Sequence, residues 1–305
     1  MQKLFPKTLL EFEHWFRTEA SCREYLIRVR WPGGFRCPKC GHAQSWTTAR
    51  GLLRCGKCRH DASVTAGTIF ETSHIPLRLW FRAIWLVTHQ KTGITALGLQ
   101  RVLGMGSYET AWTCLHKLRH AMIRPEREPL KGEIEVDESL IGGHEKFQGR
   151  RTIGKKSLVM IAAEVRGEGI GRIRLQQVPD SSKEHLMEFV REFVDPGSVV
   201  ITDGLPVYMN LSKLGYIHRP RLPRDKPESS KLLPRVHRVS ALLKRWLLGV
   251  HQGGVSRRQL SYYLDEFTFR FNRRLSPSRG MLFYRLVQQS VAIEPVPYSA
   301  ISKGA

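Results

Sequence analysis

Two pairs of cysteines are the feature that most restricts how this chain can fold. Cys37 and Cys40 form one Cys-x-x-Cys pair, and Cys55 and Cys58 form a second pair after 14 intervening residues. Because each pair can place two thiolates on the same tetrahedral ion, this spacing indicates a structural Zn²⁺ site rather than four free thiols. We therefore predict a zinc ribbon of short strands in residues 31–74.

The predicted zinc site is closed. Four thiolates leave no coordination position for water, so the ion is expected to hold a small fold together and not to catalyse. Gly41 and Gly56 permit a tight backbone turn beneath each pair. Cys22 and Cys114 have no cysteine at ligand spacing, and we expect both to be buried as ordinary core residues.

The charge balance points to a polyanionic partner. The chain has 49 Lys and Arg against 27 Asp and Glu, which gives a net charge of +22 and a pI near 10.2. Such an excess costs self-repulsion in the folded state, which a bound polyanion relieves. There is no run of about 18 apolar residues that could span a membrane, and Glu11 and Glu13 interrupt the apolar core that a signal peptide needs. We therefore expect a cytoplasmic protein that binds nucleic acid and no membrane.

Helical patterns occupy the segments on both sides of the predicted ribbon. Residues 8–29 are expected to form one amphipathic helix, and residues 76–122 to form several helices. Within the second segment a Gly-containing turn precedes Ser107, which can cap the following helix. This pattern resembles the helix-turn-helix architecture that reads DNA, although a plain helical hairpin would give the same pattern.

The hydrophobic pattern changes after a Pro-interrupted linker near residue 128. Three short β-branched runs are followed by a helix, a fourth run, a second helix, a last run at 216–220 and then two long helices. This order predicts an α/β domain with a mixed sheet. The expected divisions are an N-terminal helix (1–30), the zinc ribbon (31–74), a helical DNA-binding segment (75–128), the α/β domain (129–290) and a tail (291–305).

Two aspartates stand at the ends of predicted strands. Asp137 follows the run 134–136, and Asp203 follows the run 199–202. Carboxylates at the ends of adjacent core strands can converge on divalent cations. Two Mg²⁺ ions roughly 3.5–4 Å apart could then bind the attacking and leaving oxygens of a phosphoryl transfer. Either aspartate alone would more often be a turn residue or a helix cap, so the prediction depends on the pair.

A third candidate lies in a basic segment further along the chain. His237 and Lys244 are seven residues apart, which places them on nearly the same face of a helix. Nine Lys or Arg occur from Arg219 to Arg245, with only two carboxylates among them. His237 could bind a cation or carry a proton, and Lys244 could bind a phosphate. The alternative is a solvated basic loop with a satisfied histidine.

Together, these motifs resemble those of one family. In chain order they are the cysteine pairs, the helical segment, the sequences IEVDESLIGG and ITDG with Tyr208, the pair His237 and Lys244, and YYLDEFTFRFNRR. In this order the motifs are similar to those of the zinc-ribbon-bearing group of bacterial DDE insertion-sequence transposases. The resemblance extends over residues 37–274. It implies an RNase H-like catalytic domain with Asp137, Asp203 and His237 as catalytic residues. The family most often has Glu in place of His237, and imidazole is a poor ligand for Mg²⁺ and a better one for Mn²⁺.

The resemblance also implies a reaction. Such a DNA transposase would cut the element's terminal inverted repeats, leave a 3′-OH and join it to target DNA, acting as a homodimer or a larger assembly. The three catalytic residues would hold Mg²⁺ or Mn²⁺, and DNA would contact Lys244, Arg245, Arg270 and Arg273. Two alternatives stay open: a zinc-ribbon DNA-binding protein whose catalytic domain has decayed, and an RNase H-like nuclease that cuts without joining.

Overall fold

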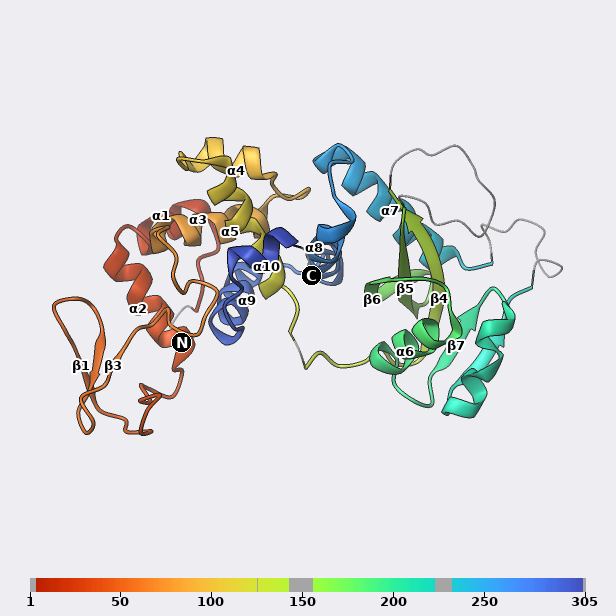
Figure 1. Ribbon diagram of the computed structural model, residues 1–305, viewed down its shortest axis with the longest axis horizontal. Helices are drawn as coiled ribbons and strands as arrows, with labels where there is room; N and C mark the ends of the chain where they lie inside the picture. The colour runs from red at the N-terminus through yellow and green to blue at the C-terminus, as the bar shows by residue number, and fades with distance from the viewer. Residues whose placement is uncertain (1–3, 125, 143–155, 223–231, 304–305) are drawn as a thin grey trace. The chain divides into compact units, whose positions relative to one another are not determined.

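The chain folds as two compact units (Figure 1). The computed structural model describes residues 4–124, 126–142, 156–222 and 232–303. The first unit comprises Met1–Arg124 and Leu275–Lys303, and the second comprises Pro125–Arg274. Among the helices in these ranges, none is both long and apolar enough to cross a bilayer.

The N-terminal segment forms two helices where the sequence predicted one. α1 (Leu9–Trp15) ends at Phe16, and α2 (Glu19–Arg30) starts afresh after Thr18. Thr18 Oγ1 accepts a hydrogen bond from the Ser21 N–H, and Ser21 Oγ accepts one from the Thr18 N–H. This capping box satisfies the free donors of the new helix end, so it favours a restart over a continuous helix.

The cysteine-rich segment contains a three-stranded antiparallel sheet in the order β1-β2-β3. Its strands are β1 (Ser45–Thr47), β2 (Leu53–Cys55) and β3 (Asp61–Ala62). Arg54 and Asp61 lie opposite each other on β2 and β3 and form two hydrogen bonds of 2.7 Å. A sheet this small buries little apolar surface, so its stability depends on the cysteines.

Further helices surround an aromatic core in the first unit. They are α3 (Leu77–His89), α4 (Ala96–Leu103), α5 (Tyr108–Ala121), α9 (Arg279–Ala292) and α10 (Tyr298–Lys303). The ring centroid of Phe283 lies 5.5 Å from that of Phe12 and 5.8 Å from those of Phe81 and Trp85. Edge-to-face contacts of this kind add to the stabilisation from burial.

The C-terminal helices α9 and α10 belong to the first unit. The sequence analysis assigns residues 275–290 to the α/β domain and residues 291–305 to a tail. In the structure the second unit ends earlier, at Arg274. α9 packs on α2 and α3 through a face that includes the buried Leu282 and Phe283. A Cβ at Gly280 would overlap the Pro6 carbonyl oxygen, so only glycine allows the N-terminal segment to pass this close.

α4 and α5 form the predicted helix, turn and helix. Gly104 ends α4 in the left-handed conformation (φ 63°), and the Ser107 side chain accepts a hydrogen bond from the Thr110 N–H at 3.0 Å. The predicted Ser107 cap is thus confirmed. Residues 114–119 of α5 are all buried, whereas Tyr108 at its start is 53% exposed. A recognition helix contacts bases mainly through its N-terminal residues, and Tyr108 is exposed at that end of α5.

The second unit is built on a five-stranded mixed sheet, which confirms the predicted α/β class. The strands are β4 (Glu133–Ile141), β5 (Ser157–Arg166), β6 (Gly169–Val178), β7 (Val199–Thr202) and β8 (Ile217–Pro220). Their order is β6-β5-β4-β7-β8, in which β4, β5 and β6 are antiparallel neighbours and β4, β7 and β8 run parallel. The first strand in the chain is therefore the central strand of the sheet.

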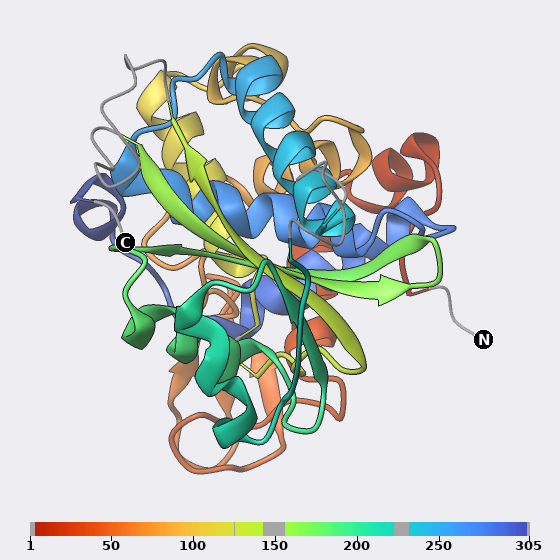
Figure 2. The same cartoon turned by 90° about the vertical axis from the view of Figure 1, so that its right-hand side faces the viewer.

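Helices cover both faces of this sheet (Figure 2). α6 (Lys183–Phe193) and the 3₁₀ helix η1 (Pro206–Leu214) pack on the face that carries Val136. α7 (Pro234–His251) and α8 (Leu260–Asn272), which follows a short 3₁₀ turn η4 (Arg257–Gln259), pack on the opposite face, where Ile161 lies. Side chains alternate between the two cores along β4 and β5. Residues 206–214 form the second helix predicted after the fourth run, and it winds as a 3₁₀ helix.

Candidate active site

Asp137 lies in the middle of β4, and its side chain faces α7. The side chain is 15% exposed, and Oδ2 lies 3.3 Å from Nε2 of His237. Oδ1 accepts a hydrogen bond from the Glu138 N–H at 2.9 Å. Burial, followed by the negative charge of Asp203, raises the pKa of Asp137 to about 6. A bound cation would relieve both of these unfavourable effects on the carboxylate.

Asp203 follows the neighbouring strand at the position that matches Asp137 in register. β7 runs parallel to β4 with Ile201 opposite Glu135. Asp137 lies two residues beyond Glu135 on β4, and Asp203 lies two residues beyond Ile201, directly after β7 ends at Thr202. The parallel pairing therefore brings together two carboxylates that are remote in sequence, and the effect of Asp203 on the pKa of Asp137 reflects their proximity.

The turn after β7 holds the carboxylate of Asp203. Gly204 adopts φ +82°, and a Cβ there would lie 2.6 Å from Cδ2 of Leu222, so this turn requires glycine. Oδ1 of Asp203 accepts a hydrogen bond from the Leu205 N–H at 3.1 Å. The ITDG motif thus encodes a strand end with a fixed acidic side chain.

His237 lies in the first turn of α7. Its side chain is 37% exposed, and it contacts Asp137 from above the sheet. The structure therefore brings the three sequence-predicted catalytic residues to one region, in which both His237 and Asp203 act on the Asp137 carboxylate. They are more widely spaced than a single-ion site: within the described ranges, groups of three or more ligating atoms lying within 4.8 Å of one another occur only among the cysteines.

Glu138 is an acidic neighbour that the sequence analysis did not single out. Burial, followed by the charges of Asp137 and Asp203, raises the pKa of Glu138 to about 7. The buried Tyr208 hydroxyl donates a hydrogen bond to Oε2 of Glu138 at 3.1 Å. Because side chains alternate along a strand, Glu138 points to the face opposite Asp137, where Tyr208 lies. The sequence signal for Glu138 was therefore only its presence in the VDES motif.

The four ribbon cysteines form the second candidate metal centre. Cys37, Cys40, Cys55 and Cys58 place their sulphur atoms within 4.8 Å of one another. This set fits a tetrahedral Zn²⁺ with four thiolate ligands. Backbone N–H groups, of Cys58 first and then of Lys57, lower the pKa of Cys55 to about 6, which favours the thiolate that a metal requires.

The backbone turns of the two cysteine pairs differ in part from the expectation. Gly41 is left-handed (φ 72°), as predicted for the first pair. In the second pair the left-handed residue is Arg59 (φ 60°) and not Gly56. A Cβ at Gly56 would instead lie 3.4 Å from the Gln44 carbonyl oxygen, which is tight but not excluded. Cys22 and Cys114 are fully buried, as expected.

Comparisons with known proteins match both units. Residues 129–272 match the family model of the ISXO2-like transposase domain, and residues 17–61 match that of the transposase zinc-ribbon domain. The chain is also 27% identical over 277 residues to an uncharacterized protein in transposable element ISH50 of Halobacterium salinarum, covering 84% of this chain and 91% of that protein. The chain belongs to the zinc-ribbon insertion-sequence transposases. The RNase H-like fold and the zinc ribbon predicted from sequence follow from this membership.

Two of the basic residues predicted to contact DNA are exposed on the transposase domain. Lys244 and Arg245 lie on α7, and both are solvent-exposed. Partial burial of its ammonium group, followed by the charge of Lys156, lowers the pKa of Lys244. Like-charge neighbours of this kind favour binding of a phosphate. Part of the basic segment predicted here, residues 223–231, lies outside the described residues.

The other two predicted DNA contacts are engaged within the transposase domain. Arg270, with 16% of its side chain exposed, lies 3.8 Å from Glu266 on the same helix. The Arg273 guanidinium lies 4.0 Å from the Phe269 ring centroid and donates to the Phe269 carbonyl oxygen at 3.2 Å. These contacts orient both arginines toward α8 itself.

The end of the distinctive FRFNRR motif protects the free edge of the sheet. The Asn272 side chain accepts from the Ile173 N–H at 2.7 Å and donates to the Ile173 carbonyl oxygen at 3.1 Å. Arg274 donates to the carbonyl oxygens of Gly171 and Ile170. Because β6 is an edge strand, these contacts stand in for a neighbouring strand. This explains a motif whose position the sequence could not relate to the sheet.

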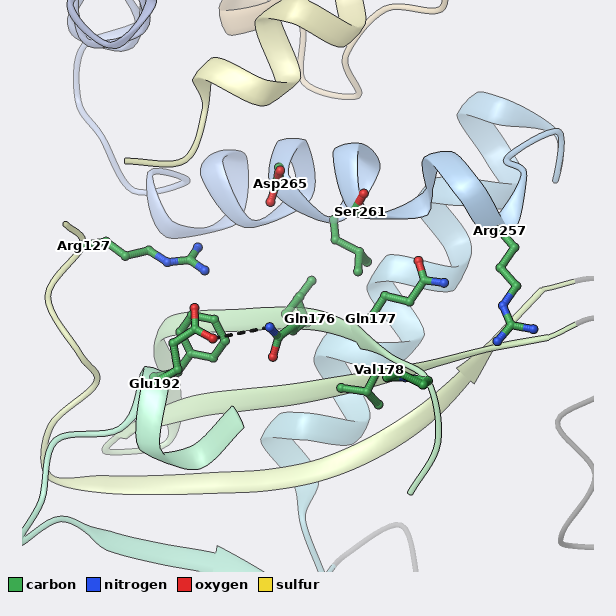
Figure 3. A pocket seen from close by; sticks show the side chains of 12 residues that line it. Arg127, Gln176, Gln177, Val178, Glu192, Arg257, Ser261 and Asp265 are labelled. Atoms are coloured by element: carbon green, nitrogen blue, oxygen red, sulfur yellow. Dashed lines mark hydrogen bonds between the residues drawn. The ribbon is translucent and has the colours of Figure 1, made fainter. Parts of the chain in front are cut away.

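A polar cavity of about 540 Å³ lies at the β6 edge of the transposase domain (Figure 3). Arg127 and Asp265 both turn into it, and Gln176 is hydrogen-bonded to Glu192 within it. Burial raises the pKa of Asp265 to about 7. None of the three predicted catalytic residues lines this cavity, so it is separate from the candidate active site.

Proposed function

We propose that this transposase cuts DNA at the ends of its element and joins the freed strand to target DNA, using Asp137, Asp203 and His237. The observation that carries the proposal is the parallel pairing of β4, which bears Asp137, with β7, which leads directly into Asp203, together with the 3.3 Å contact between His237 and Asp137. A carboxylate on a core strand and a carboxylate fixed in the turn after the neighbouring strand form an anionic pair of the kind that divalent-metal phosphoryl transfer requires.

The residues of this group fit divalent cations. Asp137 and Asp203 offer hard oxygen ligands, and burial, followed by the charge of Asp203, raises the pKa of Asp137, an effect that a bound cation would oppose. His237 offers a nitrogen that suits Mn²⁺ better than Mg²⁺. When bound, the cations would neutralise charge on the phosphoryl oxygens and assist deprotonation of the attacking oxygen.

In the proposed reaction the protein forms no covalent intermediate with DNA. In the first step the oxygen of water attacks phosphorus at the element end, and the bond to the 3′ oxygen breaks to leave a 3′-OH. In the second step this 3′ oxygen attacks a phosphorus of target DNA and displaces a target oxygen, so one phosphodiester replaces another. Asp137 and Asp203 fix the position of the reaction, and His237 can accept or return a proton. Positioning and charge stabilisation then carry the rate.

DNA binding is distributed over both units in this proposal. The net charge of +22 supports association with the phosphate backbone. Lys244 and Arg245 on α7 would contact phosphates beside the catalytic residues. The zinc ribbon and the α4–α5 hairpin would bind the terminal inverted repeats, and pairing two DNA ends requires at least a homodimer.

The presence of His237 supports one competing function. A domain that has lost the usual third carboxylate could bind DNA without cutting it, and the contact between His237 and Asp137 would then be only an ion pair. A nuclease that cuts without joining is the other alternative. The DNA-binding protein would give no cut product, and the nuclease would give cut product but no joined product.

A reconstituted reaction separates these functions. Purified protein is incubated with element-end DNA, target plasmid and Mg²⁺ or Mn²⁺, and cut and joined products are resolved on a gel. We expect joined product from the wild type, and its loss by at least 100-fold in Asp137→Asn or Asp203→Asn. Asp180→Asn, which alters an exposed aspartate beside α6, is the matched control. Binding without cutting would support the decayed protein, and cutting without joining would support the nuclease.

A further inference from the structure

Glu135 is a buried carboxylate that anchors the helix carrying His237. It lies on β4, two residues before Asp137, and only 3% of its side chain is exposed. Its Oε2 accepts hydrogen bonds from the backbone N–H groups of Arg235 at 2.7 Å and Val236 at 3.0 Å. Its Oε1 accepts from Nη1 of Arg235 at 3.1 Å.

These bonds satisfy the N-terminal end of α7. The first N–H groups of a helix have no partner within the helix and carry partial positive charge, so a carboxylate facing them is stabilised. The side chain of the preceding residue, Leu233, cannot accept these hydrogen bonds because leucine has no polar atom in its side chain. The acceptor comes instead from the central strand of the sheet. Arg235 also donates to the Gly167 carbonyl oxygen at 2.7 Å, which ties the same turn to the β5–β6 connection.

The Glu135 anchor is the first of three contacts between one face of β4 and α7. The second is the 3.3 Å contact of Asp137 with His237, and the third is a 2.7 Å hydrogen bond between Ser139 and Ser240. Glu135, Asp137 and Ser139 alternate along the strand, so all three point toward the helix. A rotation or slip of the first turn of α7 would break the Glu135 bonds and move His237 away from Asp137.

We propose that Glu135 is a positioning residue of the active site: by binding the first turn of α7, it holds His237 against Asp137. The proposal rests on the proposed function, in which these residues hold divalent cations. Loss of Glu135 lowers cation affinity and turnover and leaves the affinity for DNA unchanged. If the ion pair between Glu135 and Arg235 served only stability, its loss would lower the melting temperature without a selective effect on cation affinity and turnover.

The test compares two strand glutamates that each pair with an arginine. Glu135→Gln keeps the size of the side chain but removes its charge, and Glu133→Gln removes the partner of Arg219, 2.6 Å away and not on α7. Mn²⁺ binding to the full-length protein is measured by electron paramagnetic resonance of the free ion. Turnover and KM for element-end DNA are measured in Mn²⁺, and amide exchange is followed at Arg235 and Val236.

Glu135→Gln is expected to weaken Mn²⁺ binding and turnover roughly 10- to 100-fold, as is typical when a residue that orients metal ligands is removed. KM for DNA should stay within about twofold, exchange at Arg235 and Val236 should accelerate, and Glu133→Gln should match the wild type. Normal Mn²⁺ binding and turnover in Glu135→Gln overturn the inference alone. Failure of the wild type to bind Mn²⁺ or cut DNA overturns the proposed function and the inference together.

Discussion

The imidazole of His237 and the carboxylate of Asp137 are in direct contact, 3.3 Å apart, although one lies on α7 and the other on β4. In most of the family a carboxylate is expected at the position of His237. Here the third residue places an imidazole nitrogen beside Asp137. This substitution should therefore alter the choice of metal ion more than the fold of the site.

The first prediction concerns metal preference. We expect wild-type cleavage to be faster in Mn²⁺ than in Mg²⁺, because imidazole is a better ligand for Mn²⁺. His237→Glu should raise the ratio of the Mg²⁺ rate to the Mn²⁺ rate by about tenfold or more, since it restores a hard oxygen ligand. Initial cleavage rates in the two metals measure the ratio. His185→Glu on α6 is the control and should leave it unchanged; an unaltered ratio in His237→Glu would show that His237 does not bind the metal.

The second prediction concerns the zinc ribbon. Cys55→Ala should lose the single bound Zn²⁺ and bind element-end DNA at least tenfold more weakly, because β1, β2 and β3 depend on the metal for their fold. Zinc content is measured by atomic absorption and DNA binding by mobility shift. Cys22→Ala removes a buried thiol whose pKa is raised to about 12 by burial, and it should keep the zinc. Equal zinc loss in both variants would contradict the assignment of the four ligands.

Sequence patterns anticipated those parts of the fold that depend on local signals. Ser107 caps α5 because a serine directly before a helical run can accept a hydrogen bond from a free N–H group of the first turn. Asp203 follows the end of β7, as predicted, whereas Asp137 lies in the middle of β4, because that strand continues to Ile141. The parallel pairing of β4 and β7 completes the approach of the two residues.

The features that sequence could not predict depend on tertiary partners. The apolar face of α9 would suit either core, and only packing against Phe12 and Phe81 assigns it to the first unit. In the sequence, Glu135 is one of several acidic residues near Asp137. Only the position of α7 shows that Glu135 accepts a hydrogen bond from the first turn of that helix. The role of Asn272 at the β6 edge requires the sheet order, which no local pattern encodes.

A third prediction tests the basic face of α7. Lys244→Ala should weaken DNA binding about equally for all sequences and reduce the slope of log affinity against log salt by about 1, because one phosphate contact is lost. Binding is measured at several salt concentrations. Lys183 lies on α6, on the opposite face of the sheet, so Lys183→Ala should leave the slope unchanged. If Lys244→Ala leaves the slope at the wild-type value, Lys244 does not contact phosphate.

A fourth prediction uses the pH dependence of stability. Burial raises the pKa of Asp265 to about 7 in the folded protein, against about 4 in the unfolded chain, and Arg127 only partly offsets this. As pH rises between these values, the unfolded chain loses its proton first, so the native state loses stability and the full penalty is present above about pH 7. Asp265→Asn removes the penalty. Its melting temperature should exceed that of the wild type by more at pH 8 than at pH 5.

Asp180→Asn provides the opposite case for this comparison. Hydrogen bonds from Ser182 and His185 lower the pKa of Asp180 to about 2, so its ionised form is favoured in the folded protein. Removing that carboxylate should not stabilise the protein at pH 8. Equal effects of Asp265→Asn at both pH values would mean that Asp265 is ionised throughout.

The last prediction concerns the pairing of Asn272 with both backbone groups of Ile173. Asn272→Ala would leave a buried N–H and a buried C=O on β6 without these partners, at a cost of about 1–3 kcal/mol in the free energy of unfolding. It would also expose an edge that can pair with another chain, so we expect aggregation at lower temperature than in the wild type. Denaturant unfolding and light scattering measure the two effects.

Two further variants make this prediction specific. Asn272→Asp has nearly the same shape and keeps an acceptor for the Ile173 N–H, but it loses the donor and places a negative charge beside the Ile173 carbonyl oxygen. It should therefore be destabilised like Asn272→Ala. Asn210→Ala, on η1, changes an asparagine that is not at the β6 edge and should behave as the wild type. Wild-type stability in Asn272→Ala would mean that water replaces the amide without cost, and the edge of β6 would then owe its protection to Arg274 alone.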